Sequence, residues 1–221
     1  MAVSYFLVCP VLPLLALGQA PQYARQGFET TLGPAIPGTP DRIVWKHGAR
    51  KVVEFDGSEE NVHGTFLDRV VLDWHTAALT IKDLQAGDSG PYELEATINS
   101  KRFYSQHEVE VIEKVAVPTI SCVLNGTDGS GGKPDEPRTL ATLTCSAEGP
   151  PSLITYRWTL LKGVLDGRGL LVPLVGKQDE TVYTCQVNNP VSQEKREFVA
   201  KDCYPGKTRI RKLVATAACR S

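Results

Sequence analysis

Cysteine is the residue type in this chain whose number and spacing constrain the chemistry most. The 221 residues contain six cysteines, and none lies between Cys9 and Cys122. Cys145, Cys185 and Cys203 follow Cys122 in the second half, and four cysteines allow three disulfide pairings. The alternative is a structural zinc site, which needs closely spaced ligands such as C-x-x-C, and this sequence has no such pair. We therefore predict two disulfides in the second half of the chain and none in the first.

Stable disulfides require an oxidising compartment, and the start of the chain predicts export to one. Residues 6–17 are apolar, and Ala16-Leu17-Gly18 supplies small residues at the spacing of a cleavage site, although the usual preceding Lys or Arg is missing. The alternatives are a buried strand, which Pro10 and Pro13 disfavour, and an uncleaved anchor, for which the run is short. We predict a signal peptide over residues 1–20 and an extracellular location.

Two further motifs concern modification and phosphate binding. Asn125-Gly126-Thr127 is a sequon for N-glycosylation, so we predict Asn125 as a glycosylation site. Gly131-Gly132-Lys133 resembles the end of a phosphate-binding loop, but Thr127 replaces its first glycine and Pro134 replaces its magnesium-binding Ser or Thr. The segment is therefore interpreted as a glycine-rich connection between two strands.

No pattern in the chain predicts catalysis. The sequence contains no G-x-S-x-G, no H-E-x-x-H and no zinc spacing. Lys and Arg number 24 against 25 Asp and Glu, which leaves a formal net charge of -1 rather than the basic excess of a nucleic-acid-binding protein. The four histidines are scattered, and each is most simply a surface or loop residue: His47, His63, His75 and His107. We predict a protein that is not an enzyme and has no cofactor, small-molecule substrate or nucleic-acid partner.

The elements that position the cysteines are short strands separated by turn residues. Expected strands of the second half are 117–124, 140–145, 156–158, 182–187 and 198–203. Tyr183 lies two residues before Cys185, and Trp158 lies on an earlier strand, as in an immunoglobulin sandwich. That resemblance pairs Cys145 with Cys185 across the two sheets and leaves Cys122 to pair with Cys203. The fold expected here is a C2-type sandwich with two disulfides.

The first half repeats the same signature without its cysteine. Its copy is Asp88-Ser89-Gly90-Pro91-Tyr92-Glu93-Leu94, with Leu94 at the cysteine position. Expected strands start near Phe28 and cover 43–46, 51–55, 69–72, 78–81, 92–98 and 103–112. The strand at 51–55 makes this a variable-type sandwich. Without a disulfide, its core depends on apolar packing of Trp45, Leu72, Leu79, Ile81, Tyr92 and Leu94.

One charged pair is expected to close the end of this first sandwich. In variable-type domains an arginine on strand D and an aspartate before strand F form a bidentate ion pair. Arg69 and Asp88 occupy these positions. The alternative is that they are two unrelated surface charges. We expect the pair.

The expected organisation is all-β, with two sandwiches in tandem. A chain of 221 residues has the length of two domains of about 100 residues. We place the variable-type domain at residues 22–113 and the C2-type domain at 116–204. Residues 205–221 form a basic tail.

Longer runs of sequence extend the resemblance to a family. The runs are Trp45-Lys46-His47-Gly48-Ala49-Arg50-Lys51-Val52-Val53-Glu54, Asp68-Arg69-Val70-Val71-Leu72-Asp73, Ala78-Leu79-Thr80-Ile81 and Tyr183-Thr184-Cys185-Gln186-Val187-Asn188-Asn189-Pro190-Val191-Ser192. They resemble the SLAM-related immunoglobulin adhesion group, and the likeness covers about Tyr23 to Cys203. The extra outer disulfide is also similar to that group.

The resemblance implies a function in cell recognition. In that group the first domain binds an immunoglobulin-family counter-receptor on another cell, or its own copy, through the face of strands C, C′, F and G. The corresponding outward residues are Lys46, Arg50, Lys51, Glu54, Asp56, Glu93 and Glu95. We therefore expect an adhesion or co-stimulatory ligand of immune cells that binds weakly through this charged face. The alternatives are charges that only solvate an exposed sheet, a soluble decoy, and a module that pairs only with itself.

The tail departs from the pattern of the group. Members usually end in a transmembrane helix or a lipid anchor, whereas residues 205–221 contain neither a long apolar run nor a lipid-anchor signal. The expectation is a cell-surface protein if an anchor is missing from this sequence, and a secreted one otherwise. Cys219 then either pairs between chains or stays free.

Overall fold

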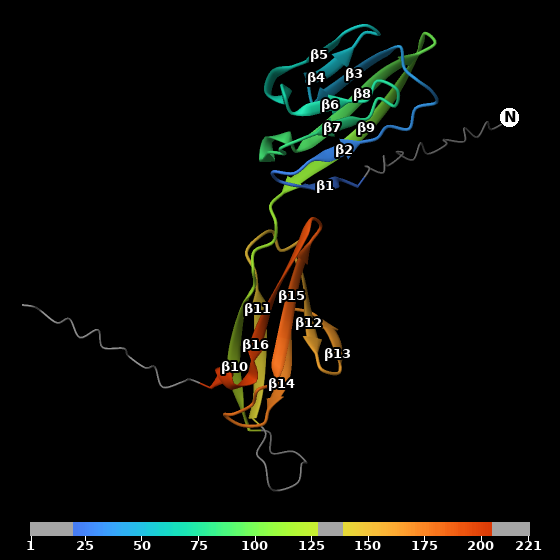
Figure 1. Cartoon of the computed structure of the whole chain (residues 1–221). Helices are drawn as coiled ribbons and strands as arrows, with labels where there is room; N and C mark the ends of the chain where they lie inside the picture. Colours follow the sequence, from blue (N-terminus) through green and yellow to red (C-terminus); the bar gives the residue numbers. More distant parts are fainter. Residues whose placement is uncertain (1–19, 128–138, 205–221) are drawn as a thin grey trace, which may run out of the picture. The chain divides into compact units, whose positions relative to one another are not determined.

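The computed structural model describes residues 20–127 and 139–204, and the chain divides into one unit ending at Ile112 and a second starting at Glu113. Strands dominate both units (Figure 1). The expected signal peptide, glycine-rich connection and basic tail fall on residues 1–19, 128–138 and 205–221, outside the described residues.

The first unit is a sandwich of two sheets. Six strands form the larger sheet in the order β1-β9-β8-β3-β4-β5, and three form the smaller in the order β2-β7-β6. The larger sheet contains β1 (Gln22–Arg25), β3 (Arg42–His47), β4 (Arg50–Phe55), β5 (Glu60–Val62), β8 (Gly90–Ile98) and β9 (Lys101–Ile112). The smaller contains β2 (Thr30–Leu32), β6 (Val70–Leu72) and β7 (Leu79–Ile81). β1 pairs with β9 in parallel, and the remaining pairs in this unit are antiparallel.

The core of the first unit is apolar and contains no cysteine. Trp45 and Tyr92 are fully buried, and Leu94 is 1% exposed at the position where the repeated signature has its cysteine. The polar atoms of the two buried rings are satisfied, because Trp45 Nε1 donates to the carbonyl of Ala77 and the Tyr92 hydroxyl donates to the carbonyl of Asp88, both at 2.9 Å. Buried hydrogen bonds of this kind avoid the cost of unpaired polar groups.

Three details of this unit differ from the strands expected from the sequence. β1 precedes the first expected strand, which was placed near Phe28. Phe28 lies outside β2 and is 54% exposed, with the Arg25 guanidinium 4.2 Å from its ring centre. β5 was not expected, and its three residues are polar or only partly buried. The alternation of polar and apolar residues in β5 is too short to distinguish a strand from a loop. The segment becomes a strand because it pairs with β4.

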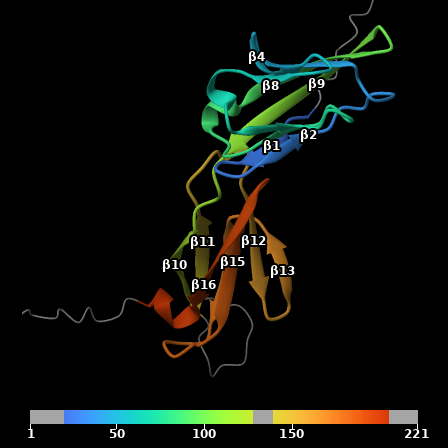
Figure 2. The ribbon, with the colours of Figure 1, turned by 45° about the horizontal axis from the view of Figure 1, so that its top comes forward.

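The second unit is a sandwich of a three-stranded and a four-stranded sheet. Their orders are β10-β11-β14 and β13-β12-β15-β16. The first sheet contains β10 (Thr119–Thr127), β11 (Thr139–Ser146) and β14 (Gly169–Leu174). The second contains β12 (Thr155–Leu160), β13 (Gly163–Asp166), β15 (Val182–Asn189) and β16 (Ser192–Val199), with β13 at its outer edge (Figures 1 and 2).

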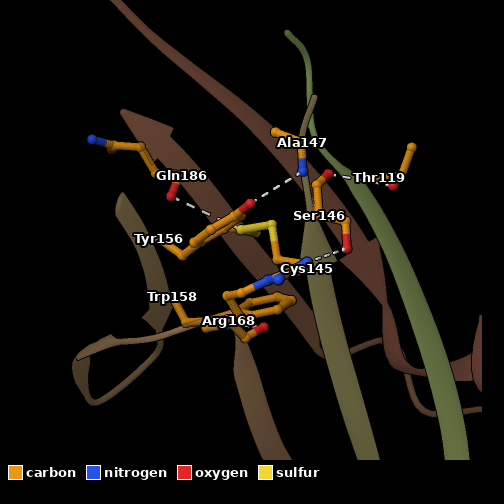
Figure 3. The surroundings of a disulfide bond; sticks show 9 residues. Thr119, Cys145, Ser146, Ala147, Tyr156, Trp158, Arg168 and Gln186 are labelled. Atoms are coloured by element: carbon orange, nitrogen blue, oxygen red, sulfur yellow. Dashed lines mark hydrogen bonds between the residues drawn. A yellow bond between two sulfur atoms is a disulfide. The ribbon is translucent and has the colours of Figure 1, made fainter. Parts of the chain in front are cut away.

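Two disulfides stabilise the second unit, and one of them joins its two sheets. Cys145 on β11 is bonded to Cys185 on β15, and both are fully buried with Trp158 (Figure 3). Cys122 on β10 is bonded to Cys203. The predicted fold, a variable-type sandwich without a disulfide followed by a C2-type sandwich with two, is confirmed.

The last strand of this unit ends earlier than expected. Residues 198–203 were expected to be a strand, but β16 ends at Val199 and Ala200–Cys203 is a 3-10 helix. β16 belongs to the four-stranded sheet, whereas Cys122 belongs to the three-stranded one. The chain therefore has to leave β16 and cross to the other sheet for Cys203 to reach Cys122.

Candidate recognition surface

The outward side of the larger sheet in the first unit is built by alternation along β3 and β8. Trp45 and Leu94 are registered partners and point into the core. Neighbours along a strand point to opposite faces, so the registered partners Lys46 and Glu93 point outward, as does Glu95 opposite Val44. The sequence-predicted residues Lys46, Glu93 and Glu95 thus share one face.

β4 contributes to the same face through an irregular register. Glu54 is opposite Val44, and Lys51 is opposite Lys46, with a bulge between the two pairs. The bulge lets both Val52 and Val53 join the core at 0% exposure, while Lys51 and Glu54 remain outside. A bulge of this kind redirects side chains relative to a regular strand.

Arg50 and Asp56 were also predicted from the sequence, but they do not lie among these outward residues. Arg50 is opposite His47, whose ring stacks inward on Tyr92 at 4.5 Å between centroids. Asp56 follows β4 in a turn, and its Oδ1 accepts hydrogen bonds from the backbone N–H of Glu59 and from the N–H and hydroxyl of Ser58 at 2.8–2.9 Å. These bonds lower the pKa of Asp56 to about 2. The Asp56 carboxylate therefore stabilises this turn.

Charged side chains of both signs contact one another on the outward face. Lys51 Nζ lies 2.6 Å from Glu54 Oε2, and His63 Nε2 lies 3.2 Å from Glu54 Oε1. The hydrogen bond from Lys51 is the main cause that lowers the pKa of Glu54, and His63 adds to it. Among the described residues, no carboxylate lies within salt-bridge distance of Lys46. Lys46 is thus available to pair with a partner.

β9 adds outward residues that were not predicted from the sequence. Its register with β8 places Tyr104 opposite Glu95 and Gln106 opposite Glu93. Tyr104 is 67% exposed, and Arg102 Nε lies 3.5 Å from Glu95 Oε1. Exposed tyrosine and arginine are enriched at protein interfaces. The alternation along 103–108 could have identified these residues, because the neighbouring strand had already been assigned a face.

We name this surface the outward face and define it by Lys46, Lys51, Glu54, Glu93, Glu95, Arg102, Tyr104 and Gln106 around Val44. Val44 is only 7% exposed although it points away from the core. It is covered by its charged neighbours, since Glu54 and Glu95 are its registered partners on either side. The face therefore presents charges of both signs around one covered valine, and such charges suit recognition of a complementary surface.

The remaining predicted residues lie elsewhere. Arg69 and Asp88 form a bidentate pair, with Nη2–Oδ1 at 2.8 Å and Nη1–Oδ2 at 3.0 Å. Asn125 is exposed at an irregularity of β10, and its Nδ2 donates to the Thr142 hydroxyl at 2.7 Å. The side-chain amide is therefore at the surface of the second unit.

Comparison with known proteins identifies distant relatives rather than a family model, since no family model matches. Human lymphocyte function-associated antigen 3 is 33% identical over 90 residues, covering 40% of this chain and 34% of the relative. Human SLAM family member 5 is 24% identical over a region that covers 63% of this chain and 38% of the relative. Human hepatic and glial cell adhesion molecule is 28% identical over a region that covers 64% of this chain and 35% of the relative. The chain spans about a third of the length of these relatives.

Solved structures show the same fold. The CD2-binding domain of CD58 (lymphocyte function-associated antigen 3) aligns with a TM-score of 0.58 and 22% identity over 80% of this chain and 94% of that chain. Murine CEACAM1b aligns with a TM-score of 0.57 and 16% identity over the same shares. The chain is thus a distant relative of immunoglobulin-superfamily adhesion molecules, which are a non-enzymatic class. Within the described residues, no helix has the length and apolar character needed to cross a bilayer.

Proposed function

We propose that this protein is an extracellular adhesion or co-stimulatory ligand of immune cells that binds an immunoglobulin-family counter-receptor through the outward face. The observation that carries the proposal is the register of β9, β8, β3 and β4, which gathers charges of both signs and Tyr104 on one side of the sheet. The relatives support the same reading, because they include adhesion molecules and because the aligned CD58 domain is described as CD2-binding.

The physical character of the outward face predicts weak and fast binding. Exposed ion pairs contribute about 0–1 kcal/mol each, and they influence the association rate and the choice of partner more than affinity. We therefore expect a dissociation constant on the order of micromolar, equivalent to about 8 kcal/mol. Many copies in one cell contact would then supply avidity. Salt should weaken the interaction because it screens exposed charges.

Charge reversal at Lys46 tests the proposal. Lys46→Glu removes a cation that has no ion-pair partner on the outward face. It also places a third carboxylate beside Glu93 and Glu95. We expect affinity to fall at least tenfold. The matched control is Lys82→Glu, the same reversal at an exposed residue directly after β7 of the other sheet.

Surface plasmon resonance on the full chain provides the measurement. The immobilised probes are the ectodomains of CD2, SLAM family member 5 and hepatic and glial cell adhesion molecule, together with this chain itself. Binding that is lost in Lys46→Glu and retained in Lys82→Glu supports the outward face. Equal binding by both variants would show that another surface makes the contact.

The mixture of signs on the outward face also favours homophilic binding as a second candidate. Lys46 and Glu93 lie side by side on neighbouring strands, so a two-fold arrangement can place each against the opposite charge of another copy. A response confined to the probe made of this chain would select this alternative.

A further inference from the structure

The edge strand β13 of the second unit is exposed along its whole length. All four residues of Gly163–Asp166 are exposed. β13 pairs with β12 on one side, and no other strand in residues 20–127 and 139–204 pairs with its open side. Both views show it at the margin of its sheet (Figures 1 and 2). Its outer backbone groups are therefore available to another strand.

Three exposed side chains at this edge are apolar. Leu161 is 90% exposed in the turn before β13, and Val164 and Leu165 are 55% and 53% exposed on it. Edge strands are normally protected by charged side chains, proline, bulges or short length. β13 is short and has one charged residue, Asp166, but it has no lysine or proline, and its four pairs with β12 run without a register shift. A regular edge with exposed apolar side chains can accept an added strand.

The hydrogen bonds to β12 show which residues of β13 face the open side. The N–H of Gly167 donates to the carbonyl of Tyr156 at 2.9 Å, and Asp166, the residue before it, is opposite Arg157. In an antiparallel pair, hydrogen-bonded and non-hydrogen-bonded positions alternate. Leu165 and Gly163 therefore direct their backbone groups to β12, while Val164 and Asp166 direct theirs outward.

Hydrogen bonding and charge together select one register for a second copy. An antiparallel pair of identical strands has two-fold symmetry, and outward groups meet when the axis lies at Val164, Leu165 or Asp166. Of these, the register with Val164 opposite Val164 of the other copy pairs opposite charges. The same register places the turn residue Lys162 beside Asp166 of the other copy, twice by symmetry. Asp166 Oδ1 lies 2.9 Å from Arg157 Nε, and the side chains of Arg157 and Asp166 are 52% and 76% exposed. A carboxylate can accept hydrogen bonds from two cations. The edge is thus complementary to itself in hydrogen bonding and in charge.

We propose that β13 pairs antiparallel with β13 of a second copy, with Val164 on the two-fold axis, and joins two four-stranded sheets into one sheet of eight strands. The interface uses the second unit alone and does not depend on the outward face of the first. The occupant is a second copy of this chain because the register that fills the open backbone groups also pairs Lys162 with Asp166.

Cysteine cross-linking tests the register. Val164→Cys in a Cys219→Ser background of the full chain brings two thiols together at a hydrogen-bonded pair, where Cα atoms are about 5.5 Å apart, a separation that a disulfide can span. The matched control is Leu171→Cys, at a residue 60% exposed on β14 of the other sheet. We expect at least fivefold more covalent dimer from Val164→Cys after mild oxidation. Equal yields from the two variants would overturn the proposal.

Reversible association provides the second measurement. Val164→Pro removes an N–H that faces the open edge and leaves the bonds to β12 intact, and prolines are tolerated at such positions. In sedimentation equilibrium of the Cys219→Ser chain, we expect Val164→Pro and Lys162→Glu each to weaken dimerisation at least tenfold without changing the melting temperature. Lys82→Glu should leave it unchanged, and the effects of Val164→Pro and Lys162→Glu, both in the second unit, separate this interface from the outward face. A parent chain that stays monomeric at millimolar concentration, or a Lys162→Glu chain that dimerises as the parent does, would overturn the proposal.

Discussion

At the scale of single residues, the buried carboxylate of Asp88 determines how the end of the first sandwich is stabilised. Asp88 is 4% exposed, and its oxygens accept hydrogen bonds from the Arg69 guanidinium and from the N–H of Gln85 at 2.8 Å. Arg69 also donates to the carbonyl of Asp83 at 2.9 Å. A buried charge is tolerated only when it is paired and hydrogen-bonded. The buried carboxylate of Asp88 therefore requires Arg69 as its cationic partner.

Removal of Arg69 should destabilise the first unit strongly. We expect Arg69→Ala to cost about 3–5 kcal/mol, because it leaves Asp88 buried without its cation. Arg69→Lys should recover only part of this loss, since an ammonium group lacks the planar fork of a guanidinium. The measurement is urea denaturation followed by far-ultraviolet circular dichroism. Arg102→Ala is the control, because its contact with Glu95 is exposed at 3.5 Å and screened by solvent, so this substitution should leave stability close to that of the parent.

Tyr92 predicts how stability changes in alkali. Burial, and then the charge of Asp88, raises the pKa of Tyr92 above its ordinary value. The folded protein therefore keeps this proton when the unfolded chain loses it, so stability holds below pH about 10 and falls as pH rises above it. Tyr92→Phe should flatten that fall and cost about 1 kcal/mol at neutral pH through its lost hydrogen bond. Denaturant titrations of the parent and of Tyr92→Phe at pH 7 to 11 check this, and an equally steep fall in both would contradict it.

At the scale of elements, the β8–β9 hairpin shows local strain in the strand pair that carries five of the eight residues of the outward face. Ile98 is opposite Lys101, so Asn99 and Ser100 form a two-residue turn, and both have positive φ, at 48° and 62°. Two-residue turns of this type match the twist of the strands but need left-handed backbone at both positions. Asparagine adopts it readily, whereas serine does so at a cost. The tight turn nevertheless maintains the register of Glu93, Glu95 and Tyr104.

Ser100→Gly should relieve this strain. Glycine adopts positive φ without penalty, and Asn-Gly is the preferred pair for this turn. We expect a gain of about 0.5–1 kcal/mol in the free energy of unfolding and a higher melting temperature for the first unit, measured by differential scanning calorimetry. Gly33→Ser is the matched control, because φ at Gly33 lies outside the left-handed region and a Cβ there meets nothing within 4 Å. A Ser100→Gly chain that melts at or below the parent's temperature would contradict this account of the turn.

At the scale of the whole molecule, the two units are stabilised by different means. The first depends on apolar packing around Trp45, Tyr92 and Leu94. The second adds disulfides that close segments of 40 and 81 residues, each worth about 4 kcal/mol in the chain-entropy account. A chain with two such units need not unfold in a single transition.

Reduction should therefore separate the stabilities of the units. In dithiothreitol we expect amide protection of β11 and β15 to fall by at least a hundredfold, because both bridges are lost, while protection of β3 and β8 stays within twofold. Hydrogen exchange read by mass spectrometry on peptides from each strand makes the comparison. A similar loss of protection in β3 and β8 would show that the first unit does not hold its fold independently of the bridges.

Local sequence patterns were enough to predict the class of both sandwiches and the side on which many residues lie. Tyr183 before Cys185, its copy around Tyr92, and the alternation through Trp45 and Lys46 are local patterns, and local patterns report strand type and facing. The absence of cysteines between Cys9 and Cys122 likewise indicated a first core without a bridge. The patterns could be predicted because each depends on residues only a few positions apart, and the missing bridge follows from a count of one residue type.

Only the tertiary structure decided which strands meet and at which register. The bulge that turns Val52 into the core, the capture of Asp56 by its own turn, and the crossing that takes Cys203 out of β16 all depend on contacts between distant segments. β13 is the clearest case, because four exposed residues become an edge strand only through pairing with β12. Pairing between strands is non-local, so the sequence of one strand does not specify its neighbour or its open side.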